Sequence, residues 1–205
     1  MTEMLYKRDP ALDRAALFEE LRCAILDCKT CGLCEKRTHV VPGEGDITSP
    51  LMFVGEGPGE VEDREGRPFV GPAGQLLTKI LAAAGFSREE VYITNIVKCR
   101  PPGNRLPQID EVVNCQRWLE AQISLIRPKL IVTLGNTPLK WFLHCAEGIT
   151  KVRGHWYQWH GAELMPMFHP SYLLRNQSRE RGGPKDLTWR DIREVRARYE
   201  ALRKR

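Results

Sequence analysis

Hydrophobic runs of strand length alternate with helical patterns along most of the chain. Strand-length runs occupy residues 51–54, 91–97, 130–134 and 164–168. Helical spacing of apolar positions predicts helices over residues 11–28, 76–84, 109–126 and 188–202, and a further helix that starts near Pro138. Strands that alternate with helices favour a mostly parallel sheet covered on both faces.

The remaining segments lack such periodicity. Residues 1–10 are expected to form a loose arm, and residues 144–161 an irregular stretch with a hairpin through 156–159. Pro166 predicts that the fourth strand is irregular or lies at an edge. A chain of 205 residues is expected to form one domain, residues 1–205.

Composition indicates a cytoplasmic globular protein. Hydrophobic residues make up 42% and charged residues 28%, and no apolar run reaches membrane-spanning length. The net charge of +5 is uneven, because residues 175–205 hold 11 Lys or Arg against 5 Asp or Glu, whereas the preceding residues hold 20 against 21. This basic segment indicates either a polyanionic partner or simply a solvated helix face.

Residues 51–85 have the pattern of a pocket floor. A buried strand is followed by a turn with three glycines, an acidic loop, a second Gly/Pro segment and a helix. Ligands of open α/β sheets bind just beyond the carboxyl ends of the strands. We therefore expect a binding site at this turn.

Cysteines at four positions have the pattern of a metal site. Cys31 and Cys34 form a C-x-x-C pair, Cys99 directly follows the second strand run, and Cys115 lies in a predicted helix. Four thiolates hold either Zn²⁺ or a [4Fe–4S] cluster, although the spacing is not that of a zinc ribbon. A redox dithiol with two core cysteines is the alternative.

Three further cysteines bear on this site less directly. Cys28 extends the pair to C-x-x-C-x-x-C, but it also fits the apolar stripe of the first helix. Cys23 and Cys145 are predicted to be small buried hydrophobic side chains.

Four segments, taken in order, carry a resemblance to a known family. They are GEGPGEVED at 55–63, GRPFVGPAG at 66–74, YITNIVKC at 92–99 and HPSYLLR at 169–175. With the four cysteines, they make the chain resemble the family 4 uracil-DNA glycosylases over roughly residues 13–200. The resemblance implies a three-layer α/β/α fold around a four-stranded parallel sheet, and a [4Fe–4S] cluster on Cys31, Cys34, Cys99 and Cys115.

The implied reaction is hydrolysis of the bond between uracil and deoxyribose, after the base has left the DNA stack. Phe69 is expected to stack on the flipped uracil, and the Asn95 amide to match its O4 and N3–H. His169 is expected to donate to O2 as negative charge develops there. Glu56 and Gly57 lie in the turn, where backbone N–H groups also face the base.

Water activation is less evident from the resemblance. Gly57 occupies the place at which other families carry a water-activating Asp or Asn. Glu56, Glu62 and Asp63 are therefore the carboxylate candidates for positioning water or stabilising the sugar cation, with Glu56 and Glu62 as the catalytic choices. The loop 100–107 contains no histidine, so stable covalent trapping of the product is not expected, and Glu56 argues against the broader base specificity of family 5.

Contacts with DNA are expected at the end of the last motif. The candidates are Ser171, Leu173, Leu174 and Arg175. The remaining histidines are interpreted as loop residues. The sequence thus predicts a monomeric uracil-DNA glycosylase. The alternatives are a non-catalytic iron–sulfur module that binds uracil in DNA, and an electron-transfer protein.

Overall fold

The computed structural model describes residues 10–178 and 180–204. Its helices are α1 (Pro10–Leu26), α2 (Glu60–Glu65), α3 (Pro72–Ala83), α4 (Ile109–Ile126), α5 (Asn136–Leu143), α6 (Ile149–Val152), α7 (Pro170–Arg175) and α8 (Pro184–Arg203), with 3-10 turns η1 (Gly32–Glu35) and η2 (Pro102–Asn104). Its strands are β1 (Glu44–Gly45), β2 (Leu51–Gly55), β3 (Tyr92–Asn95), β4 (Leu130–Leu134), β5 (Tyr157–Trp159) and β6 (Ala162–Met167). The expected arm lies outside the described residues, apart from Pro10, which begins α1.

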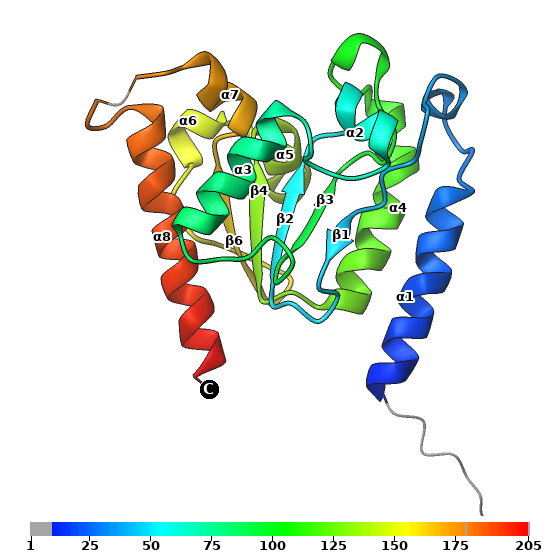
Figure 1. Ribbon diagram of the computed structural model, residues 1–205, viewed down its shortest axis with the longest axis horizontal. Coiled ribbons are helices and arrows are strands. Elements are labelled where there is room, and N and C mark those ends of the chain that lie inside the picture. The colour runs from blue at the N-terminus through cyan, green and yellow to red at the C-terminus, as the bar shows by residue number, and fades with distance from the viewer. Residues whose placement is uncertain (1–9, 179, 205) are drawn as a thin grey trace, which may run out of the picture.

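One mixed sheet runs through the molecule in the order β1-β3-β2-β4-β6-β5 (Figure 1). The four central strands are parallel, as predicted, and pair in registers such as Gly55↔Asn95 and Leu134↔Met167. Short antiparallel strands, β1 and β5, extend the sheet at its two edges. The pairing of β5 with β6 confirms the predicted hairpin.

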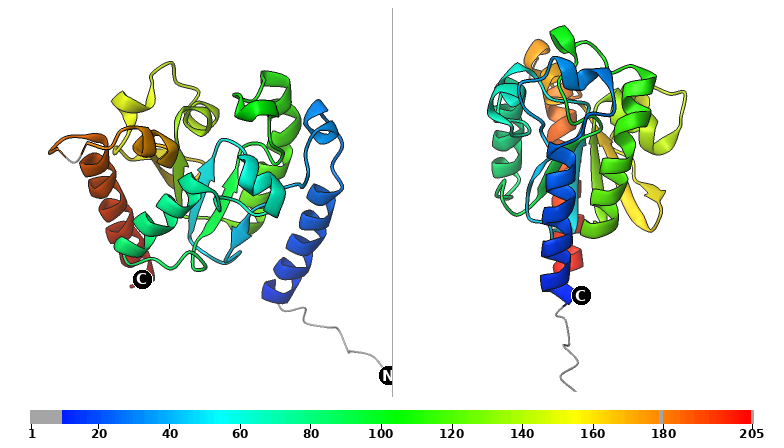
Figure 2. Two further views of the ribbon diagram at one scale, coloured as in Figure 1. Left: turned by 45° about the horizontal axis from the view of Figure 1, so that its top comes forward. Right: turned by 90° about the vertical axis from the view of Figure 1, so that its right-hand side faces the viewer.

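Helices cover both faces of the sheet and make three layers (Figure 2). Successive side chains of a strand point to opposite faces, so Phe53 packs with α3 and α8, whereas Met52 and Val54 pack with α4 and α5. α1 lies beside α4 on the second face. These two apolar clusters hold the strand ends in fixed positions, which is what the site requires.

Element boundaries follow local chemistry where the sequence signal is strong. α4 begins where Glu111 accepts a hydrogen bond from the backbone N–H of Gln108 at 2.7 Å. It ends at Arg127, whose φ of 54° lies in the left-handed region, immediately before Pro128. The helix therefore occupies the predicted residues 109–126.

Four expectations need correction. The predicted acidic loop contains the short helix α2, and the segment after β6 is the helix α7 with His169 as its N-cap. α8 starts at Pro184 rather than at 188, because proline suits the first helical turn. Cys23 is exposed and Cys145 is half-buried, so neither is a core residue.

Pro166 lies in β6, which is an inner strand. However, β5 pairs only with residues 162–164 of β6, so Pro166 lies beyond its reach. The N–H group that proline lacks therefore removes no hydrogen bond between β6 and β5. None of the helices in the described ranges is both long and apolar enough to span a membrane.

Candidate active site

A cleft of about 580 Å³ opens where β2, β3 and β6 end. Nine of the predicted site residues line it: Glu56, Gly57, Glu62, Phe69, Asn95, His169, Ser171, Leu174 and Arg175. Leu173 does not, because α7 turns its side chain inward and leaves it 2% exposed. The expected DNA contact by Leu173 is therefore inconsistent with the fold, whereas Leu174 and Arg175 are exposed at the rim.

Phe69, Asn95 and His169 converge within this cleft. A Cβ at Gly55 would lie 2.5 Å from the Phe69 ring and 2.4 Å from Asn95 Oδ1, so only glycine lets both side chains approach the strand end. The Phe69 and His169 rings lie with centroids 5.8 Å apart and planes tilted by 35°. An aromatic face, an amide and an imidazole thus meet in one place.

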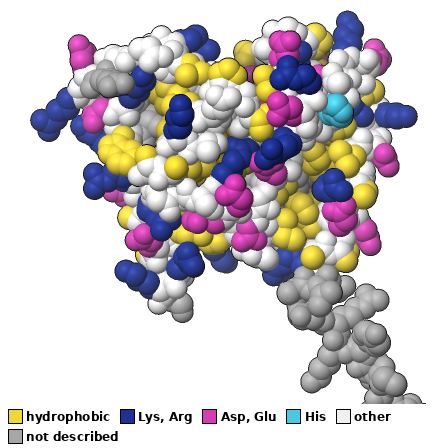
Figure 3. Space-filling view, viewed as in Figure 1, with side chains coloured by type: hydrophobic (Ala, Val, Ile, Leu, Met, Phe, Trp, Pro, Cys, Tyr) yellow, Lys and Arg dark blue, Asp and Glu magenta, His cyan; other side chains and the backbone are white. Residues whose placement is uncertain are grey.

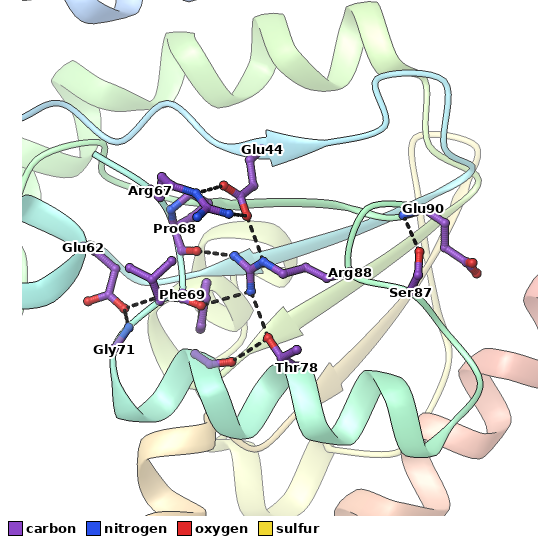
Figure 4. Close-up of polar contacts among 12 residues, drawn as sticks. Glu44, Glu62, Arg67, Pro68, Phe69, Gly71, Thr78, Ser87, Arg88 and Glu90 are labelled. Carbon is purple, nitrogen blue, oxygen red and sulfur yellow. Dashed lines mark hydrogen bonds and ion pairs between the residues drawn. The ribbon is translucent and has the colours of Figure 1, made fainter. Parts of the chain in front are cut away.

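Glu62 is engaged with the backbone of the loop that carries Phe69 (Figure 4). Its Oε1 accepts hydrogen bonds from the N–H groups of Val70 at 3.0 Å and Gly71 at 2.7 Å. Because Gly71 is the N-cap of α3, the carboxylate also lies at the positive end of that helix. These contacts favour a role in holding the loop over the predicted role in catalysis.

Asn95 has an unpaired acceptor inside the protein. The residue ends β3 with 1% of its surface exposed, and its Oδ1 has no hydrogen-bond partner among the described residues. A buried carbonyl oxygen without a donor costs roughly 1–3 kcal/mol. Because this oxygen adjoins the cleft, a ligand N–H group would supply the missing donor.

Lys98 supports the strand end from behind and was missed by the sequence analysis. It is 1% exposed, and its Nζ donates to the backbone oxygen of Asn95 at 2.7 Å, to Thr94 Oγ1 at 2.7 Å and to Gln122 Oε1 at 2.8 Å. Three donated protons are those of an ammonium group. Burial lowers the pKa of Lys98 to about 7. A charged side chain after a strand carries no periodic signal, so this role could not be predicted from the pattern of residues.

His169 is held in one tautomer by the first turn of α7. The backbone N–H of Ser171 donates to His169 Nδ1 at 3.1 Å, and Ser171 Oγ lies 2.8 Å from the same nitrogen. Nδ1 is therefore unprotonated, which leaves Nε2 as the N–H donor of the ring. Burial, aided by the nearby Arg175 charge, lowers the pKa of His169 to about 4. The imidazole is consequently a neutral donor at pH 7.

Glu56 is oriented from α5. Thr137 Oγ1 donates a short hydrogen bond to Glu56 Oε2. The turn itself is tied to β3, because the N–H of Val97 donates to the backbone oxygen of Glu56 at 3.1 Å. Within the described part of the chain, Oε1 of Glu56 makes no hydrogen bond, and the side chain lines the cleft.

Five cysteines line one small cavity between η1, α4 and the end of β3: Cys28, Cys31, Cys34, Cys99 and Cys115. Among residues 10–178 and 180–204, no three Cys, His, Asp or Glu side chains are grouped as for a single metal ion. A four-iron cluster is wider than one ion, so it takes its thiolates from further apart. The Arg37 guanidinium donates to Cys99 Sγ at 3.1 Å, and the backbone N–H of Lys98 donates to Cys115 Sγ at 3.3 Å. Donors aimed at sulfur suit an anionic group in this cavity.

Cys28 follows the end of α1 and is not part of its apolar stripe. Trp118 Nε1 donates to its sulfur at 3.2 Å, and Thr30 Oγ1 lies 3.1 Å away. Burial opposes ionisation, but the hydrogen bonds from Thr30 and Trp118 prevail and lower the pKa of the thiol.

Three basic side chains of the final segment form ion pairs within the described residues. In α8 and its surroundings, Arg196 pairs with Glu90 and Glu200, Arg190 with Asp186, and Arg198 with Glu163. Figure 3 shows basic and acidic side chains interspersed over the visible face. These pairs neutralise part of the excess positive charge of the segment.

Comparison with known proteins gives a consistent picture. Residues 42–193 match the model of the family described as "Uracil DNA glycosylase superfamily". The chain is 51% identical to the type-4 uracil-DNA glycosylase of Thermotoga maritima, over 82% of this chain and 88% of that protein. It is 48% identical to the type-4 enzyme of Sulfurisphaera tokodaii, over 77% and 76%. Identity to a type-5 uracil-DNA glycosylase of Pyrobaculum aerophilum is 34%, over 68% and 69%.

Proposed function

Because the chain belongs to the type-4 branch of the uracil-DNA glycosylase superfamily, we propose that it hydrolyses the N-glycosidic bond of deoxyuridine in DNA. The products are free uracil and an abasic site. One observation carries the proposal to this site: the unpaired, buried Oδ1 of Asn95 adjoins an aromatic ring and a neutral imidazole donor.

Base recognition follows from the chemistry of the uracil edge. With the ring of uracil against Phe69, Asn95 Oδ1 accepts from N3–H and Asn95 Nδ2 donates to O4. Cytosine presents the opposite arrangement, an acceptor at N3 and a donor at N4. Its N3 would face Asn95 Oδ1, acceptor against acceptor, and its N4 amino group would face Asn95 Nδ2, donor against donor. Gly57 allows the backbone of the turn to approach the base closely.

The leaving group is an anion, and His169 is suited to stabilise it. Its Nε2–H donates to uracil O2 as the glycosidic bond breaks, and the imidazole need not change its protonation state. Glu56 holds the attacking water through Oε1 while Thr137 fixes the other carboxylate oxygen. Glu62, with Oε1 committed to two backbone N–H groups, acts by holding the Phe69 loop.

DNA is proposed to lie across the rim formed by Ser171, Leu174 and Arg175. Leu174 is exposed and fills space left by the extruded nucleotide, and Arg175 contacts a phosphate. We propose that the enzyme acts as a monomer, because the proposed recognition and hydrolysis need no residue beyond those of this one cleft. The seven cysteines are those of a reducing compartment, which supports a cytoplasmic location.

For the cysteine cavity we propose a [4Fe–4S] cluster on Cys31, Cys34, Cys99 and Cys115, with Cys28 as a neighbour hydrogen-bonded to Trp118. When bound, the cluster would supply a covalent crosslink between η1, the end of β3 and α4. The hydrolysis itself depends on the chain's own side chains in the cleft.

The proposal is tested with matched oligonucleotides that carry one uracil or one thymine at the same position. After incubation and alkaline cleavage of abasic sites, the uracil strand alone should be cut. Uracil-dependent binding without a cut product would instead support the non-catalytic module. Absence of any uracil dependence would refute the assignment.

A further inference from the structure

The backbone of Phe69 is held in an unfavourable conformation. Its φ of 51° lies in the left-handed region, which a bulky residue adopts at a cost of about 1–2 kcal/mol. Gly74 makes room for it, since a Cβ there would lie 1.9 Å from the Phe69 carbonyl carbon. Other contacts must therefore hold this loop, and with it the position of the ring.

Arg88 provides contacts of this kind from the loop before β3 (Figure 4). Its guanidinium donates to the backbone oxygens of Pro68 and Phe69, the latter at 3.0 Å, and to Thr78 Oγ1 at 3.3 Å. Its Nε donates to Glu44 Oε1 at 2.8 Å, and its side chain is only 11% exposed. Arg88 thus links Phe69 to β1 and to α3 at once.

The loop is held by opposite charges on its two sides. Arg88 binds the carbonyl groups of residues 68 and 69, and Glu62 binds the N–H groups of residues 70 and 71. Hydrogen bonds with a charged partner are about twice as strong as neutral ones. The two side chains together fix the peptide groups on both sides of the Phe69 ring.

We propose that Arg88 is a positioning residue for the uracil site: its guanidinium sets the position of the Phe69 ring and thereby the affinity for the flipped base. This rests on the proposed function, in which Phe69 stacks on uracil. Arg88 does not line the cleft, so it acts through Phe69 rather than on the base.

The chain offers a matched control in Arg67. This side chain also pairs with Glu44, at 2.8 Å, but it is 59% exposed and, within the described residues, donates to neither the Pro68 nor the Phe69 carbonyl oxygen. Arg67→Met therefore removes an ion pair with the same carboxylate and leaves the loop carbonyl groups bound.

The experiment measures inhibition by free uracil, with KM and kcat on uracil-containing DNA, at a temperature where melting curves show every variant to be folded. Arg88→Met should raise the inhibition constant and KM about tenfold, with a smaller change in kcat. A tenfold change is the size expected when one or two charged hydrogen bonds are lost. Arg67→Met should change neither by more than about twofold. Arg88→Lys keeps the charge but loses the planar set of N–H donors of the guanidinium, so its inhibition constant and KM should resemble those of Arg88→Met.

A double-mutant cycle with Phe69→Ala decides the matter. If Arg88 acts through the ring, Arg88→Met should have almost no further effect on the inhibition constant once Phe69 is alanine. An equal fold-change in both backgrounds, or equal effects of Arg67→Met and Arg88→Met, would overturn the inference. If Phe69→Ala alone leaves uracil inhibition unchanged, the stacking role itself is refuted, which is a separate result.

Discussion

Replacement of Asn95 by leucine removes both polar groups of the amide and keeps its branched arrangement of heavy atoms, with larger methyl groups in place of the oxygen and nitrogen. In the proposed complex, the amide makes two hydrogen bonds to uracil, through N3–H and O4. Each contributes about 1–2 kcal/mol in a site from which water is excluded. The expected loss is about 2–4 kcal/mol, or roughly 30- to 1,000-fold in kcat/KM on uracil-containing DNA.

Stability should change in the opposite direction. Asn95 Oδ1 has no partner among the described residues, so Asn95→Leu breaks no protein hydrogen bond of that oxygen and removes a buried unpaired acceptor. The melting temperature should therefore stay level or rise while activity falls. Loss of activity without loss of stability is typical of a residue kept for binding.

Thr133→Val is the matched control. Thr133 Oγ1 is also buried and unpaired, but it lies in β4 and outside the lining of the cleft. The valine variant should keep wild-type kcat/KM. A role of Asn95 in binding uracil is excluded if Asn95→Leu keeps kcat/KM within about threefold of wild type, or if the two variants lose activity equally.

Three other predictions concern the remaining parts of the site. His169→Ala should lower kcat about 100- to 1,000-fold with little change in KM. Because burial lowers the pKa of His169 to about 4, the plot of wild-type kcat/KM against pH should show no inflection from this residue between pH 5 and 8. An inflection near pH 6.5 that His169→Ala abolishes would contradict this. Glu56→Gln should reduce kcat about 100-fold. Glu62→Gln should reduce kcat less than about tenfold, because the amide oxygen of glutamine can still accept hydrogen bonds from the N–H groups of Val70 and Gly71. Single-turnover rates in the reverse order would contradict the assigned roles. Cys31→Ser should abolish the broad visible absorption of an iron–sulfur protein and lower the melting temperature. Cys23 is exposed and lies outside the cavity, so Cys23→Ser should leave both properties unchanged. Equal spectra for the two variants would count against the cluster.

Sequence patterns predicted those parts of the fold in which each residue's role is local. β4 and α4 match the predicted residues because a continuous apolar run and a helical apolar stripe, closed by Arg127 and Pro128, each define one element. α2 and α7 were missed because six residues are too few for a periodic signal. The error at Leu173 has the same origin, since only the direction of α7 decides which of two adjacent leucines is buried.

The candidate site divides along similar lines. Nine of its cleft-lining residues were identified by motif resemblance, and the parallel strand ends bring them together, whereas Asn104 and Arg105 also line the cleft and lie outside the motifs. Arg88 lies outside the four motifs, and Lys98 lies within one but had no assigned role, because their partners are backbone oxygens and buried side chains set by the tertiary fold. A charged residue in a loop is usually solvated, and only its burial in the structure distinguishes these two.

The central claim is that uracil binds in this cleft against Phe69, with its N3–H paired to Asn95. A crystal structure of the protein soaked with uracil tests it most directly. The base should be stacked on the Phe69 ring, with N3 about 3 Å from Asn95 Oδ1 and O2 within hydrogen-bond distance of His169 Nε2. Uracil bound elsewhere, or bound here with Asn95 Oδ1 still unpaired, would contradict it.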